Sequence, residues 1–210
     1  MKLVNSKSGL AIVLSGLKGF YEPKVGEEQY LMDGEIGAFV LWNAYLMGDL
    51  GGKVIADLGC GTGLLGIGAL LLGANKVFFV DSDKKALETA KNNTLKAKSE
   101  GYSLGKAEFV YKDIGKLEIK ADVVLQNPPF GTKKEHIDAI FLEKALKIAP
   151  VVYSFHKSET KSFLEQFSAK NNAKITHIWD FKFPLKATFS FHRRQIHRIN
   201  VSCLRFEKLI

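Results

Sequence analysis

The sequence contains little cysteine and no long apolar segment. Its two cysteines, Cys60 and Cys203, form neither a metal-type pair nor a disulfide framework, as is typical of a protein in a reducing cytoplasm. The longest apolar run, 64–72, is interrupted by Gly66 and Gly68 and is about half the ~20 residues needed to cross a bilayer. The five histidines lack metal-ligand spacing, and no repeat or linker divides the chain. We therefore predict one domain over residues 1–210, without a metal or a membrane segment.

The composition is that of a globular protein, with 46% hydrophobic and 25% charged residues. Thirty Lys and Arg residues against twenty-two Asp and Glu leave a net charge of +8, a mild argument for a polyanionic partner. The first twenty residues superficially resemble a signal peptide but lack its cleavage site, and Ser15 and Lys18 interrupt them at helical spacing. An amphipathic helix is the better interpretation.

Short β-branched runs alternate with helical patterns along most of the chain, and the last part holds two long strands without a helix between them. This order predicts a Rossmann-like α/β fold: a mostly parallel seven-stranded sheet, helices on both faces, and a C-terminal antiparallel hairpin. Residues 1–50 form an N-terminal helical segment and 51–210 the core. The predicted strands are 54–58, 77–81, 109–111, 122–125, 151–155, 174–183 and 197–206, and the later helices are 64–72, 84–98, 138–148 and 158–170.

Two of these helices carry finer predictions. In the lysine-rich helix 84–98, Leu87, Ala90 and Leu95 are expected to face inward. Ser158 is expected to cap the N-terminus of the helix 158–170.

Ligands of such a sheet bind beyond the carboxyl ends of its strands. The segments just past the predicted strands are 57–63, 81–83, Asp113 and 127–131, which are acidic, glycine-rich or amide-bearing. This edge is therefore suited to a cationic or hydroxyl-rich ligand. Asp113 could accept a hydrogen bond from an adenine amino group, or it could cap a turn.

The glycine loop after the first strand has the GxGxxG pattern at 61–66, which also occurs in dinucleotide-binding proteins. Asp57 argues against a pyrophosphate ligand, because a carboxylate repels phosphate and attracts a sulfonium or ammonium group. The run from Asp57 through Gly59 and Gly61 is instead the first motif of class I methyltransferases that use S-adenosylmethionine. Asp81 is spaced to accept hydrogen bonds from the ribose hydroxyls. A tight turn without a ligand is the simpler alternative.

The tetrapeptide Asn127-Pro128-Pro129-Phe130 follows a buried strand at the same edge. The Asn127 side-chain oxygen and the Pro128 carbonyl can accept hydrogen bonds from an amine that is conjugated to a ring. These bonds favour a pyramidal nitrogen, whose lone pair is then available for methyl transfer. The two prolines stiffen the backbone, and Phe130 offers a face for stacking. Adenine N6, guanine N2 and a glutamine amide all fit this arrangement.

Several basic residues are candidates for RNA contact. Lys133 lies just past the Asn-Pro-Pro loop, and Arg193 and Arg194 lie in a segment that interleaves aromatic and basic residues. His156 and Lys157 follow a predicted strand on the ligand side and are candidates for phosphate contact. A solvated basic turn is the alternative for residues 189–198.

With these motifs, the chain resembles the methyltransferase-like protein 5 family and its archaeal relatives, which are N6-adenine RNA methylases. The similarity runs from about residue 28 to 206 and includes Asn127-Pro128-Pro129-Phe130 with its following residues. The family's N-terminal cofactor-side motif matches residues 28–30. The threonine usually found two residues after the tyrosine is replaced by Met32.

The resemblance implies methylation of adenine N6 in small-subunit ribosomal RNA, with S-adenosylmethionine as cofactor. A protein glutamine-N5 methyltransferase, a guanine-N2 RNA methyltransferase and a non-catalytic RNA-binding relative remain alternatives. The resemblance also implies a small zinc-containing activator, joined by strand pairing near residues 107–112. The cofactor contacts that it implies are Gln29, Tyr30, Asp57, Gly59, Asp81 and Asp113, and the substrate contacts are Asn127 and Phe130.

Overall fold

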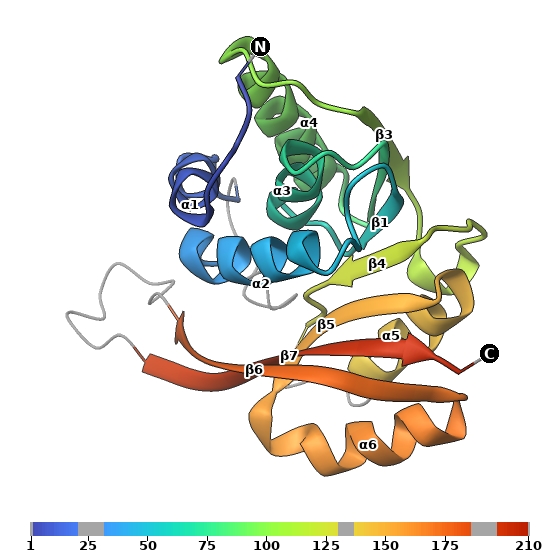
Figure 1. Cartoon of the computed structure of the whole chain (residues 1–210). Helices are drawn as coiled ribbons and strands as arrows, with labels where there is room; N and C mark the ends of the chain where they lie inside the picture. Colours follow the sequence, from blue (N-terminus) through green and yellow to red (C-terminus); the bar gives the residue numbers. More distant parts are fainter. Residues whose placement is uncertain (1, 21–31, 130–136, 186–196, 210) are drawn as a thin grey trace, which may run out of the picture.

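The computed structural model describes residues 2–20, 32–129, 137–185 and 197–209 (Figure 1). The strands are β1 (Val54–Leu58), β2 (Lys76–Asp81), β3 (Lys106–Tyr111), β4 (Val123–Gln126), β5 (Val151–Lys157), β6 (Ala173–Leu185) and β7 (His197–Lys208). The α-helices are α1 (Lys7–Ser15), α2 (Gly34–Leu46), α3 (Leu64–Leu71), α4 (Lys84–Ser99), α5 (Ile137–Ile148) and α6 (Lys161–Lys170). Within these ranges, no helix is long and apolar enough to cross a membrane.

The strands form one sheet in the order β3-β2-β1-β4-β5-β7-β6. The first five strands of this order pair in parallel, and β7 enters antiparallel between β5 and β6. The predicted fold class is therefore confirmed. The chain runs outward from β1 to β3 and then returns to β4 on the other side of β1, so the carboxyl ends of β1 and β4 meet where the strand order reverses.

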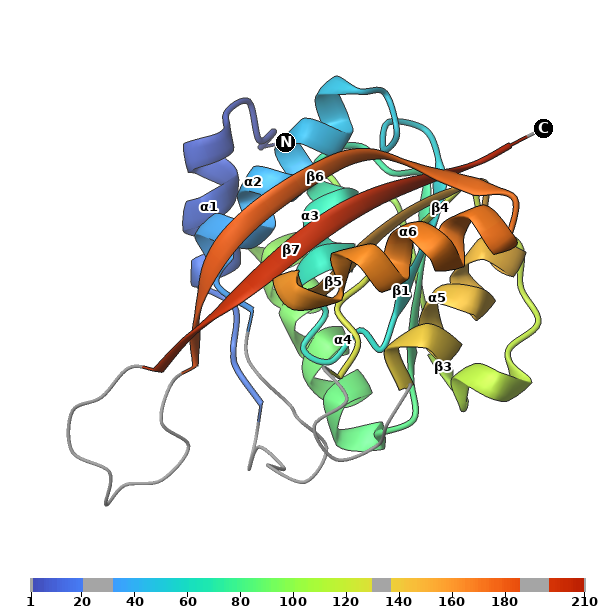
Figure 2. The same ribbon diagram turned by 90° about the horizontal axis from the view of Figure 1, so that it is seen from below.

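Helices cover both faces of the sheet (Figure 2). Neighbouring residues of β1 serve opposite faces, because side chains alternate along a strand. Ile55 packs in a core cluster with residues of α1 to α4, and Ala56 in a second cluster with residues of α5 and α6. Both clusters hold fully buried side chains, so the sheet is sandwiched between two apolar layers.

Helix α3 is buried along its whole length, and its glycines let it pack closely. A Cβ on Gly68 would lie 2.3 Å from Leu41 of α2, and one on Gly66 would lie 2.4 Å from Phe79 of β2. A larger residue would push α3 away from α2 at position 68 and away from the sheet at position 66. The glycine loop that begins this helix therefore has a rigid support.

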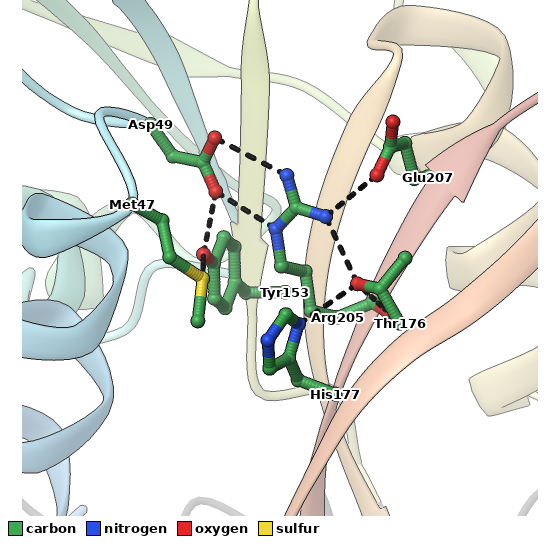
Figure 3. A network of polar contacts seen from close by, with 7 residues as sticks. All are labelled: Met47, Asp49, Tyr153, Thr176, His177, Arg205 and Glu207. Carbon is green, nitrogen blue, oxygen red and sulfur yellow. Dashed lines mark hydrogen bonds and ion pairs between the residues drawn. The ribbon is translucent and has the colours of Figure 1, made fainter.

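A buried polar network joins the end of α2 to the antiparallel part of the sheet (Figure 3). The Asp49 carboxylate accepts hydrogen bonds from the Tyr153 hydroxyl at 2.6 Å and from Arg205 Nε at 2.8 Å. Arg205 also donates through Nη1 to Thr176 and Glu207, each at 2.9 Å. Burial and the neighbouring Asp49 carboxylate raise the pKa of Tyr153, so its hydroxyl stays a donor. The network holds β5, β6 and β7 to the first core layer.

Two finer predictions are wrong. Leu95 is 54% exposed, because it lies about 100° around α4 from the buried Thr94; the inward positions near it are Asn93, Thr94 and Ala97. Ser158 does not cap an α-helix, because a short 3-10 helix, Ser158–Thr160, precedes α6. The Ser158 hydroxyl instead lies 2.7 Å from that of Ser202 on β7.

Candidate active site

The loop between β1 and α3 consists largely of glycines in the left-handed region. The φ angles of Gly59, Gly61 and Gly63 are 64°, 53° and 84°, a conformation that other residues adopt only with strain. Gly63 is the N-cap of α3. The loop therefore turns tightly at the carboxyl end of β1, and a Cβ on Gly59 would lie 3.1 Å from the Phe141 ring.

Asp57, in β1, stabilises the position of this loop. Its buried carboxylate accepts a hydrogen bond from the Gly66 backbone N–H at 2.8 Å, which ties β1 to the first turn of α3. Burial, with a smaller contribution from the nearby Asp81 carboxylate, raises the pKa of Asp57 to about 7 against the lowering effect of the Gly66 bond. A bound cation would offset the cost of burying the ionised carboxylate, because it favours that form. The site therefore favours a positively charged ligand.

Asp81 faces the same loop from the end of β2. Its Oδ2 atom accepts from the Gly61 N–H at 2.9 Å and its Oδ1 atom from the Asp83 N–H at 2.8 Å. Burial raises the pKa of Asp81, which the backbone donors partly counter. Each carboxylate oxygen keeps a second acceptor site, so Asp81 can still receive hydroxyl donors. The parallel pairing of β1 with β2 brings it to the loop.

Asp113 lies farther along the same edge, after β3. It is exposed, and its Oδ1 atom accepts from the Gly115 N–H at 2.8 Å, which caps the 3-10 helix Ile114–Lys116. The turn-capping interpretation is confirmed, and contact with an adenine amine stays a prediction.

Asn127 begins the loop after β4, next to the glycine loop. The register pairs Leu58 of β1 with Gln126 of β4, so the loop and the glycines leave the sheet side by side. The Asn127 Oδ1 atom is buried, and no described residue donates to it. An unpaired buried acceptor beside the glycine loop can receive an N–H of a ligand.

Several predicted site residues lie outside the described residues. They are Gln29, Tyr30, Phe130, Lys133, Arg193 and Arg194. Met32, at the usual threonine position, is 7% exposed and lies in the first core cluster. Its thioether lies 3.5 Å from where a Cβ on Gly37 would stand, so this side chain serves packing.

The prediction that His156 contacts phosphate is wrong. His156 lies inside β5 and is 1% exposed, because the strand continues two residues beyond its predicted end. The side chain of Lys157 is 29% exposed and lies 3.9 Å from Glu159. Lys157 is therefore the accessible member of the pair, and its contact with RNA stays a prediction.

The sequence analysis missed Asn93, which joins three segments at the glycine loop. Its Oδ1 atom accepts from the Lys18 N–H at 2.8 Å, and its Nδ2 atom donates to the carbonyls of Lys18 and Thr62, each at 3.0 Å. Phe20, two residues after Lys18, lies against the glycine loop, because a Cβ on Gly61 would lie 2.8 Å from its ring. An asparagine on the inward face of a helix was the available signal, because it is unfavourable there without partners.

The described residues hold no group of three or more His, Cys, Asp or Glu that could bind a metal ion.

Comparison with known proteins identifies the family. Residues 37–150 match the methyltransferase small domain. A crystal structure of a proposed RNA methyltransferase from Pyrococcus horikoshii is 42% identical over 99% of this chain and 100% of its own, with a TM-score of 0.88. An uncharacterised protein of Methanocaldococcus jannaschii is 37% identical over 97% of this chain and 94% of its own. The rRNA N(6)-adenosine-methyltransferase Mettl5 of Drosophila melanogaster is 34% identical over 92% of both. This chain belongs to the METTL5 family of methyltransferases.

Proposed function

We propose that this protein transfers a methyl group from S-adenosylmethionine to the N6 amine of an adenine in ribosomal RNA. The observation that carries the proposal is the buried, unpaired Asn127 Oδ1 atom beside the glycine loop. The family supports the choice of substrate, because its relatives in fly, zebrafish and nematode are rRNA N(6)-adenosine methyltransferases.

The residues around the glycine loop fit the methyl donor. S-adenosylmethionine supplies an electrophilic methyl group on a sulfonium. The buried carboxylate of Asp57 and the partly buried one of Asp81 would both be stabilised by a positive ligand. Gly59 and Gly61 hold the loop in its left-handed turn, and Asp81 receives the ribose hydroxyls. Within this proposal, residues 1–50 cap the cofactor site and bring Gln29 and Tyr30 to it.

Asn127 prepares the amine. An exocyclic amine on a purine shares its lone pair with the ring, which makes it a poor nucleophile. Acceptors at the Asn127 side chain and the Pro128 carbonyl favour a pyramidal nitrogen, and Phe130 stacks on the base. This catalysis is mostly positioning, so no nucleophilic side chain is required. Asp113 completes the proposed cofactor contacts at the adenine end.

The proposed substrate is small-subunit ribosomal RNA in the cytoplasm. The net charge of +8 supports a polyanionic partner. The basic residues proposed to hold the RNA backbone are Lys133, Lys157, Arg193 and Arg194. The adenine must leave its stack to reach Asn127, which costs least in a loop or at a junction.

The proposal also includes a small zinc-containing activator that pairs with the open edge of β3. This strand ends the sheet in the described order, and Tyr111 is 57% exposed there. An uncovered edge strand offers backbone donors and acceptors to a partner strand. A purified single chain that is monomeric and fully active on RNA would contradict this part.

The decisive experiment incubates the protein with labelled S-adenosylmethionine and either ribosomal subunits, free rRNA or total protein, followed by nucleoside and amino-acid analysis. We expect N6-methyladenosine in small-subunit rRNA. Label in N2-methylguanosine or in N5-methylglutamine would instead support one of the two alternative substrates. Asn127→Ala, which keeps the cofactor contacts, serves as the inactive control.

A further inference from the structure

Three buried polar atoms near the Asn127 loop lack a hydrogen-bond partner among the described residues. They are Gln126 Oε1, Asn127 Oδ1 and His156 Nδ1. A buried polar atom that is left unpaired lowers the stability of the fold. The proposed chemistry uses Asn127 but gives no role to the other two residues.

Gln126 and His156 belong to one chain of polar contacts beneath the loop. Gln126 Nε2 donates to Ser154 Oγ at 2.9 Å, and Ser154 Oγ lies 2.6 Å from His156 Nε2. His156 Nδ1 lies 3.6 Å from the Asp138 carboxylate in the first turn of α5. The pairing of β4 with β5 places Gln126 beside Ser154. The chain therefore runs from α5 to the last residue before Asn127.

This arrangement has the order of a Ser-His-Asp triad, but Ser154 cannot be a nucleophile. Ser154 and Gln126 are both 0% exposed and His156 is 1% exposed. A substrate cannot reach the hydroxyl without unfolding the strand. This network of polar contacts must therefore act by holding its residues, and Gln126 above all, in position.

One tautomer of His156 gives every donor in this network an acceptor. The Gln126 amide, in the orientation that gives these contacts, donates to Ser154, so the single hydroxyl proton of Ser154 is left to donate to His156 Nε2. A neutral ring then carries its proton on Nδ1, directed at Asp138. Protonation of Nε2 would remove the acceptor of Ser154. The hydroxyl could then donate only after the Gln126 amide had turned over.

Asp138 is the charged group that faces His156. Its contact with His156 lowers the pKa of Asp138, against the effect of burial, and its Oδ1 atom accepts from the Ala139 N–H at 2.9 Å. From β7 the residue opposite His156 is Ser202, which donates to Asp180. Asp180 is in turn paired with Lys161 of α6. Within the described residues, Asp138 is the only acidic side chain with an oxygen within 4.0 Å of a ring nitrogen of His156.

We propose that uncharged His156, acting through Ser154 and Gln126, positions the Asn127 loop for methyl transfer. The inference rests on the proposed function of Asn127. These three are positioning residues. His156 and Ser154 hold the side chain of Gln126, the last residue of β4, and thereby the direction in which Asn127 leaves the strand. A ring that donated through Nε2 would force the Gln126 amide to turn over.

The test combines three variants with separate measurements of kcat and KM. Ser154→Ala and His156→Ala remove a link and should lower kcat on the order of 10-fold to 100-fold, with cofactor affinity within about 2-fold. His156→Gln offers an uncharged acceptor in place of Nε2, so it should restore most of the kcat that His156→Ala loses. His177→Gln, which changes an exposed histidine on β6, is the matched control and should keep the wild-type kcat.

A second readout does not depend on the substrate. Two-bond ¹H–¹⁵N correlation spectra of the full chain should show His156 in the Nδ1–H form, and Ser154→Ala should perturb its Nε2 signal. Wild-type kcat in folded Ser154→Ala, a kcat in His156→Gln as low as in His156→Ala, or an Nε2–H tautomer would overturn the proposal. A wild type that methylates another acceptor instead of adenine would refute the proposed function. The spectra would still test the contacts between His156, Ser154 and Gln126.

Discussion

The hydrogen-bond pairing of buried polar groups differs between the antiparallel end of the sheet and the carboxyl ends of β1 and β4. At the antiparallel end, Asp49, Tyr153 and Arg205 share hydrogen bonds of 2.6 and 2.8 Å. At the carboxyl ends of β1 and β4, Asp57 has a pKa raised to about 7 and Asn127 Oδ1 is unpaired. Paired groups stabilise the native state, whereas groups left short of partners can receive a ligand. Stability and binding are thus separated along one sheet.

Breaking the antiparallel network should have the largest effect on stability. Arg205→Leu leaves the Asp49 carboxylate buried without its guanidinium, and we expect the free energy of unfolding to fall by about 3–5 kcal/mol. Urea denaturation of the purified chain measures this. Lys147→Ala, which removes an exposed i,i+4 pair with Glu143, should change it by less than about 0.5 kcal/mol. Equal effects of both changes would contradict the comparison.

Removing the unpaired acceptor should affect turnover and not stability. Asn127→Ala should lower kcat on the order of 100-fold, because the amine loses an acceptor in the transition state. The midpoint of thermal unfolding should stay close to that of the wild type, since no described donor loses its partner. Calorimetric titration should show nearly unchanged cofactor binding. Undiminished methylation by this variant would refute the role of Asn127.

Asn93 sharpens the comparison, because it is a satisfied polar residue within the ligand-binding half. Asn93→Ala removes three hydrogen bonds to Lys18 and Thr62, and we expect a loss of about 1–3 kcal/mol in unfolding free energy. Hydrogen exchange at the Lys18 amide should accelerate, and cofactor affinity should fall. Thr94→Ala, whose hydroxyl bonds within α4, is the matched control. Unchanged exchange at Lys18 would show that Asn93 does not hold the N-terminal segment.

The smallest effect concerns the protonation of Asp57. Its pKa of about 7 in the folded state lies above the unfolded value of about 3.9, so its contribution to stability is present in acid and is lost as pH rises through 7. Binding of the cationic methyl donor should have the opposite dependence and strengthen up to about 10-fold over that range.

Asp57→Asn tests both parts of that prediction. The variant keeps an acceptor for Gly66, and it should flatten the pH dependence of stability and of S-adenosylmethionine binding. S-adenosylhomocysteine, which lacks the sulfonium charge, should show the weaker dependence in the wild type. A pH dependence that persists in the variant would assign it to another group.

The local patterns of the chain predicted much of the fold and part of the site. The β-branched runs, the glycine loop and Asn127 are recognisable because each depends on neighbours in sequence, and parallel pairing then brings Asp81 to the loop. The errors have a different origin. Leu95 and Ser158 depend on which face of a helix meets the sheet and on where a strand ends.

By itself, the sequence determined the fold class, the family motifs and the chemistry available at the strand ends, because these follow from short-range patterns and residue type. Only the tertiary structure decided which polar groups are paired. Asn93 bonds to Lys18 across 75 residues and Arg205 to Asp49 across 156. Partners so distant leave no local signal, since the chain brings them together only when the whole core packs. The unpaired Asn127 oxygen and the chain from His156 to Gln126 arise in the same way.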